Sequence, residues 1–116
     1  KRRKSVNELL QIILNTLNSK QAEDIVVLDF ENKNPITDYF VIATASNLRL
    51  NNALAEYIEE AVYKAGYKLK SIEGKDSRWI LLDCYDVIVH LFVAEERSIY
   101  DLETLWGDVK RIRGLQ

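Results

Sequence analysis

The sequence predicts an α/β fold of the α+β type, in which a mixed five-stranded sheet is flanked by helices within one domain, residues 1–116. Two segments carry apolar residues at three- and four-residue steps, the spacing of one helix face. Five short apolar runs, several rich in β-branched residues, have the length of buried strands. A chain of 116 residues can bury about two thirds of its unfolded surface in a single core. No second domain is therefore expected.

The first half of the chain is predicted to begin with a helix over residues 5–20. Ser5 with Glu8 fits a capping box at its start. Two apolar runs, 25–30 and 39–44, follow as strands. The connection between them carries the chain's single proline and is expected to be a turn or loop.

A long helix is predicted next, capped by Ser46 or Asn47 and extending to about Ala65. Gly66 is the expected terminator, because glycine readily adopts the left-handed conformation that ends many helices. The predicted buried stripe consists of Leu50, Leu54, Ile58, Ala61 and Ala65.

The second half is predicted to contain three strands, 67–73, 79–84 and 87–94, and a short helix over 98–106. Short connections make these three strands an antiparallel meander. The crossover from the 39–44 strand to the 67–73 strand should be right-handed, joining parallel neighbours if the two share a sheet edge.

Charge and cysteine content restrict the function classes. Sixteen basic and eighteen acidic residues leave a net charge of −2, which argues against nucleic-acid binding by the whole domain. Basic residues cluster at both ends, so they are either solvated tails or a local contact with nucleic-acid phosphate. One cysteine excludes an internal disulfide, and the apolar stretches are too short to span a membrane. We therefore predict a cytoplasmic protein with no membrane partner.

The sequence offers little equipment for catalysis. His90 and Asp86 share a strand face but lie roughly 13 Å apart along it, too far to act as a pair. Cys84 ends an apolar strand beside carboxylates and is interpreted as a small hydrophobic residue. Asp83 and Asp86 bracket a turn, where Asp commonly bonds nearby backbone, although two carboxylates there could also hold a divalent ion.

Other features leave two interpretations open. Ser46 and Asn47 could hold an anion through the start of the helix, or simply cap it. His90 is either hydrogen-bonded within the core or exposed in a binding patch. On balance we expect no catalytic residue, no metal and no cofactor.

Carboxylates and aromatic residues instead gather in the second half, where they could form one acidic-aromatic face for a basic partner. The alternative is that the Trp residues are core and the acids a solvated rim. The exposed Tyr and Trp candidates are also compatible with a weak homodimer. The predicted contact residues are Glu73, Trp79, Asp83, Asp86, His90, Arg97, Tyr100 and Glu103.

Five ordered blocks resemble the Iojap, or ribosomal silencing factor, family. They are DIVVLDF, TDYFVIATAS, IEGKDSRWILLD, DVIVHLF and ERSIYDLETLW, and the resemblance covers residues 5–106. It implies a nucleotidyltransferase-like fold without established enzymatic activity. It also implies a translation repressor that binds the large ribosomal subunit through large-subunit ribosomal protein fourteen and blocks joining of the small subunit under starvation or in stationary phase.

The sequence departs from the patterns it resembles in two instructive places. Nucleotidyltransferases carry Gly-Ser followed by paired Asp residues, whereas here Ala45-Ser46 precedes Asn47. An enzyme using Ser46 with Asp83 and Asp86 is thus the alternative function. Family members commonly carry Tyr-Gly where this chain has Cys84-Tyr85, so a positive φ there would strain Tyr85 or change the turn.

Overall fold

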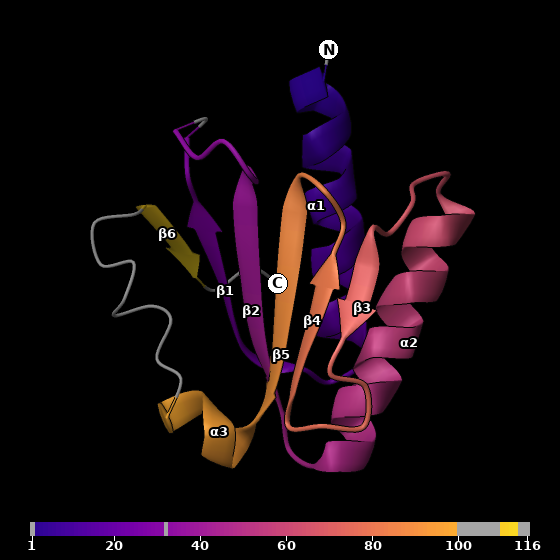
Figure 1. Ribbon diagram of the computed structural model, residues 1–116, viewed down its shortest axis with the longest axis vertical. Helices are drawn as coiled ribbons and strands as arrows, with labels where there is room; N and C mark the ends of the chain where they lie inside the picture. Colours follow the sequence, from indigo (N-terminus) through magenta and orange to yellow (C-terminus); the bar gives the residue numbers. More distant parts are fainter. Residues whose placement is uncertain (1, 32, 100–109, 114–116) are drawn as a thin grey trace.

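The chain folds into a six-stranded sheet with two long helices behind it (Figure 1). The computed structural model describes residues 2–31, 33–99 and 110–113. The order of strands across the sheet is β3-β4-β5-β2-β1-β6. The elements are α1 Arg2–Ser19, β1 Glu23–Asp29, β2 Tyr39–Ala45, α2 Leu48–Lys64, β3 Ser71–Glu73, β4 Trp79–Asp83, β5 Val87–Val93, α3 Ala94–Ile99 and β6 Lys110–Arg113.

The predicted mixed sheet with flanking helices is confirmed, and all five predicted strands are present. β3, β4 and β5 form the expected antiparallel meander. The parallel neighbour of β2 is β5, not β3, because the crossover through α2 leads to the sheet edge and the meander then folds back. The sixth strand, β6, pairs antiparallel with β1 and was not predicted.

Residues at the two ends of α2 determine where this helix begins and ends. The Asn47 side chain accepts a hydrogen bond from the Leu50 N–H at 2.8 Å, which confirms it as the N-cap. Gly66 has φ of +92° and follows the helix as predicted. The capping box proposed for α1 is wrong, because that helix already begins at Arg2 and Ser5 lies inside it.

The buried side of α2 differs from the predicted stripe. Leu54 and Ile58 are buried as expected, but Ala65 is exposed and Asn51 is fully buried. Asn51 was not predicted because an amide seldom lies in a core unless it is hydrogen-bonded. Its Nδ2 donates to the Leu91 carbonyl oxygen at 3.2 Å and to that of Ser77 at 3.4 Å.

Two predicted elements differ in length. β3 covers residues 71–73 instead of 67–73, because its pairing with β4 ends at Ser71 and Asp83, where β4 itself ends. α3 begins at Ala94, four residues before the predicted start of that helix. The rest of the predicted 98–106 helix, from residue 100 onward, lies outside the described residues.

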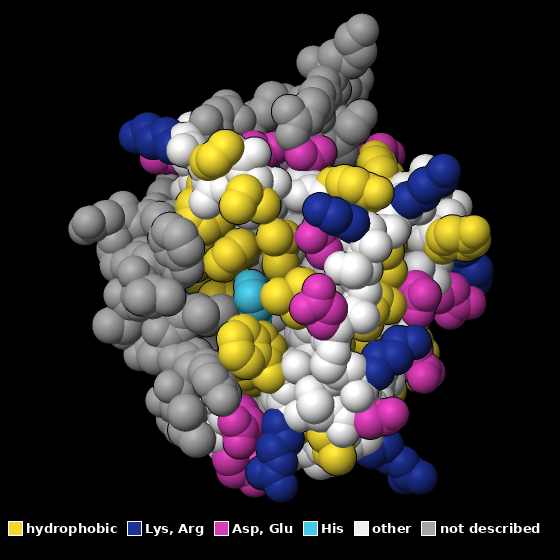
Figure 2. Space-filling model, in the orientation of Figure 1, with side chains coloured by type: hydrophobic (Ala, Val, Ile, Leu, Met, Phe, Trp, Pro, Cys, Tyr) yellow, Lys and Arg dark blue, Asp and Glu magenta, His cyan; other side chains and the backbone are white. Residues whose placement is uncertain are grey.

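The sheet has two different faces. On the rear face α1 and α2 cover a core of aliphatic side chains, among them Leu54, Ile80 and Leu82. We call the opposite side, which faces the viewer in Figures 1 and 2, the front face. Along β1 to β5, strand alternation and register place on it the side chains of Val26, Leu28, Phe40, Ile42, Thr44, Ser71, Glu73, Trp79, Leu81, Asp83, Ile88, His90 and Phe92.

Candidate docking surface

An aromatic cluster occupies the middle of the front face. Trp79 and Phe92 lie on directly paired positions of β4 and β5, and their rings stack with centroids 5.1 Å apart. Phe40 of β2 meets His90 edge-on, at 4.7 Å between centroids. Figure 2 shows hydrophobic side chains gathered around the histidine on this side. Such ring pairs add stability beyond the area they bury.

His90 is held in this cluster as a neutral ring. Only 4% of the residue is exposed. The Trp79 Nε1–H donates to His90 Nδ1 at 3.2 Å, so Nδ1 must be unprotonated and Nε2 carries the ring hydrogen. Burial lowers the pKa of His90 to about 4. The hydrogen-bonded core role is therefore confirmed, and His90 fixes the orientation of Trp79.

The other ring nitrogen of His90 is unusual. Nε2 is buried and has no hydrogen-bond partner among the described residues. Buried donors are nearly always paired, because an unpaired one loses its hydration without compensation. Within the described residues, the aromatic cluster therefore contains one buried polar group, the His90 Nε2–H, whose hydrogen bond is not satisfied.

A recess lies beside Trp79, with a volume of about 280 Å³. Its lining residues are Glu73, Gly74, Trp79 and Leu81. Glu73 is exposed at the rim, while Trp79 and Leu81 are half-buried. The recess thus combines an indole, an aliphatic surface and one carboxylate.

Gly74 is required for the shape of this recess. Its φ is +81°, and a Cβ at this position would collide with the backbone carbonyl of Trp79. The Ser77 hydroxyl closes the loop by accepting a hydrogen bond from the Trp79 N–H at 3.3 Å. Asn52 on α2 accepts another from the Asp76 N–H at 2.8 Å. The β3–β4 loop is thereby tied to the helix, and it presents Trp79 in a defined position.

The two predicted aspartates lie at the other end of β4. Asp83 shares the front face with Trp79, and its Oδ1 accepts the Tyr85 N–H at 2.9 Å, so its predicted turn role is confirmed. The backbone oxygen of Asp86 accepts from the N–H groups of Asp38 and Tyr39, which joins the turn to β2. Both aspartates are partly exposed.

The remaining predicted contact residues are not all described. Arg97 lies in α3, but its side chain is outside the described set, and Tyr100 and Glu103 lie outside the described residues altogether. The structure thus brings Glu73, Trp79 and His90 together and sets the aspartates at the far end of the face.

Sequence reasoning missed Leu81, Phe92 and Phe40 as members of this surface. Strand alternation from Trp79 was the signal that could have found Leu81, since positions 79, 81 and 83 share a face. Phe40 and Phe92 required the register between strands, which only the fold supplies.

On β1 to β5, the charged side chains that alternation places on the front face are the carboxylates Glu73 and Asp83. Such a surface favours a partner that presents cationic groups.

The alternative enzyme site is not assembled. Ser46 follows the carboxyl end of β2, whereas Asp83 and Asp86 lie at the opposite end of the neighbouring strands. Along a seven-residue strand this separation is about 20 Å. Ser46 cannot act together with the two aspartates across that distance.

Cys84 behaves as the small hydrophobic residue that was predicted. It is buried, and its pKa is raised to about 12 by burial and, secondarily, by the charge of Asp83. Within the described part of the chain, no group of three or more His, Cys, Asp or Glu side chains could hold a metal ion. No helix there has the length and apolar character needed to cross a bilayer.

Comparison with known proteins gives consistent matches over most of the chain. Residues 3–116 match the family described as ribosomal silencing factor during starvation. A protein of Bacillus subtilis named ribosomal silencing factor RsfS is 41% identical over 101 residues, covering 86% of each chain. A protein of the same name from Halalkalibacterium halodurans is 36% identical over 109 residues, covering 93% of each.

Solved structures agree with these matches. A crystal structure of a Bacillus halodurans protein superposes with a TM-score of 0.81 at 32% identity, covering 93% of this chain and 99% of that one. A Chromobacterium violaceum crystal structure gives a TM-score of 0.84 at 28% identity, covering 96% and 93%. The similarity therefore extends through the front face and the helices behind it.

Proposed function

Because the chain belongs to the ribosomal silencing factor family, we propose that it represses translation by binding the large ribosomal subunit and keeping the small subunit from joining. The names of its relatives describe regulation of the ribosome and not catalysis. The proposed partner on the subunit is large-subunit ribosomal protein fourteen. The proposed setting is nutrient limitation or stationary phase, in the cytoplasm.

The observation that carries this proposal is the recess beside Trp79, which has the Glu73 carboxylate at its rim. An indole face attracts a Lys or Arg side chain that lies over it. The Glu73 carboxylate at the rim can pair with the same cationic group, and Leu81 can contact its aliphatic stem. A basic side chain of the ribosomal protein is therefore the proposed occupant of the recess.

Occlusion requires no chemistry beyond this contact. The shortest dimension of the chain is 26 Å, whereas surfaces in contact approach within about 4 Å. A protein of this thickness, bound where the small subunit would dock, keeps the two subunits too far apart to join. The mechanism therefore depends on affinity and position alone.

Three further roles remain predictions. The contact residues Asp86, Arg97, Tyr100 and Glu103 are proposed to extend the same surface around the recess. A peripheral contact with ribosomal RNA would use the basic ends of the chain. A weak homodimer would compete for the exposed aromatic residues.

Co-sedimentation with separated ribosomal subunits tests the proposal. We expect the protein to sediment with the large subunit and not with the small one. In sucrose gradients, prior binding should reduce the fraction of joined ribosomes. Binding to neither subunit, or binding without any effect on joining, would overturn the proposed mechanism.

A further inference from the structure

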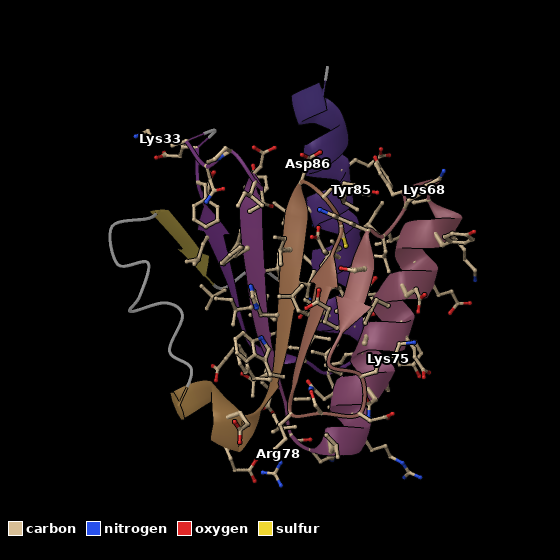
Figure 3. All side chains as sticks on the ribbon, in the orientation of Figure 1. Lys33, Lys68, Lys75, Arg78, Tyr85 and Asp86 are labelled. Atoms are coloured by element: carbon tan, nitrogen blue, oxygen red, sulfur yellow. The ribbon has the colours of Figure 1, made fainter. Side chains whose placement is uncertain are left out.

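The turn between β4 and β5 exposes an aromatic side chain in an unfavourable backbone conformation. Tyr85 has φ of +69°, and 54% of the residue is exposed. A bulky residue is rarely found at positive φ, because its Cβ crowds the backbone there. Figure 3 shows Tyr85 at the upper end of the strands, between Asp86 and Lys68.

The neighbouring hydrogen bonds hold Tyr85 in this conformation. The Asp86 N–H donates to the Cys84 carbonyl oxygen at 2.9 Å, which closes a three-residue turn around Tyr85. Such a γ-turn at positive φ is rare and strained. Asp83 accepts the Tyr85 N–H from one side, and the Asp86 carbonyl oxygen is bonded to the start of β2 on the other. The turn therefore cannot relax without losing these bonds.

Glycine would adopt this conformation without the cost that Tyr85 incurs. A strained side chain exposed at a turn contributes little to the folded core, and residues of this kind concentrate at functional sites. Tyrosine is also among the residues that contribute most to binding when an interface covers them. Stability of the free protein thus gives no reason for a tyrosine here, whereas an interaction with a partner does.

We propose that Tyr85 is a second anchor of the docking surface, which trades stability of the free protein for affinity to a basic protein surface on the large subunit. This inference rests on the proposed function and extends its contact area. From Trp79 to the turn the surface is about 20 Å long, a span that fits a standard interface of about 800 Å² per partner. Asp83 and Asp86 place carboxylates on both sides of Tyr85 in the turn, although Lys68 and Lys70 lie near the same turn. The tyrosine ring itself can accept a Lys or Arg side chain over its face.

The experiment compares Tyr85→Gly with the wild-type protein for melting temperature and for affinity to purified large subunits. Removal of the strain should raise the melting temperature by about 3 °C. Loss of the ring should weaken binding about tenfold. Tyr85→Phe keeps the ring and should bind within about twofold of the wild type.

Gln21→Gly is the matched control for backbone strain. Gln21 is exposed, has φ of +71° and lies in the turn between α1 and β1. This turn is at the opposite end of the sheet from the Tyr85 turn, which is bonded to the start of β2. The Gln21→Gly variant should therefore raise the melting temperature in the same way and leave the affinity for large subunits unchanged.

Two results would overturn the inference while leaving the proposed function intact. One is wild-type affinity in Tyr85→Gly, and the other is a lower melting temperature in that variant. If the wild-type protein itself does not bind large subunits, the proposed function fails first and this inference fails with it.

Discussion

The two faces of the sheet are built for different purposes, although they share the same strands. The rear face buries aliphatic side chains under α1 and α2, and packing alone accounts for its composition. The front face holds stacked aromatic rings, a recess with a carboxylate at its rim and a buried histidine whose Nε2 has no partner in the part of the chain that the structure describes. Stability explains the first set of residues completely and the second only in part. We assign to partner binding those features of the front face that stability does not explain.

The largest expected effect concerns the rear face, whose contribution to stability can be measured by truncating one of its residues on β4. Leu82 is fully buried on the rear face. Leu82→Ala should lower the free energy of unfolding by about 3 to 4 kcal/mol, because it removes buried methyl groups and leaves a cavity. Urea denaturation measures this loss. A change below about 1 kcal/mol would mean that the rear core does not dominate stability.

His90 should make stability depend on pH. The pKa of His90 is about 4 in the folded protein, whereas its ordinary value, taken for the unfolded chain, is 6.5. Between these values the unfolded chain binds a proton that the folded protein does not, so stability falls as the pH is lowered from 6.5 to 4. The cumulative loss at pH 4 is about 3 kcal/mol.

His90→Gln is the control, because its amide does not titrate and its oxygen can still accept from Trp79. Denaturation of both proteins between pH 7 and pH 4 should show a shallower decline for the variant. Equal slopes would show that His90 is not the group responsible.

Charge reversal on the front face should affect binding more than stability. Glu73→Lys places a cation at the rim of the recess and should weaken large-subunit affinity about tenfold. The difference should shrink at high salt, since exposed charges are screened. Glu56→Lys makes the same change in net charge on the exposed side of α2 and should bind normally. Equal losses in both variants would indicate a general charge effect and not a local contact.

Sequence patterns predicted the features that depend on local chemistry. The start of α2 at Ser46 or Asn47 and its end at Gly66 were predicted, because capping and positive φ involve only neighbouring residues. Cys84 was correctly assigned to the core. The grouping of Glu73 with Trp79 and His90 was predicted from side-chain chemistry and the family resemblance, and the register between strands places the three on one face.

Other features depend on contacts between distant segments and were missed for that reason. Asn51 is buried because carbonyl oxygens of Ser77 and Leu91, far along the chain, accept its hydrogen bonds. β6 contains only Ile112 as an apolar residue, so its pairing with β1 left no recognisable pattern. β2 pairs in parallel with β5 because the β3–β4–β5 meander folds back toward β2. Neither strand carries a sequence pattern that indicates this pairing.

The central claim is that the front face, and not the protein surface in general, binds the large subunit. The most direct test compares Trp79→Ala with Leu82→Ala for affinity to purified large subunits, at a temperature where both variants are folded. We predict that Trp79→Ala weakens binding about thirtyfold, the loss expected for a buried aromatic anchor. Leu82→Ala should bind within about twofold of the wild type despite its lower stability. Wild-type affinity in Trp79→Ala, or equal losses in both, would contradict the assignment of the front face as the docking surface.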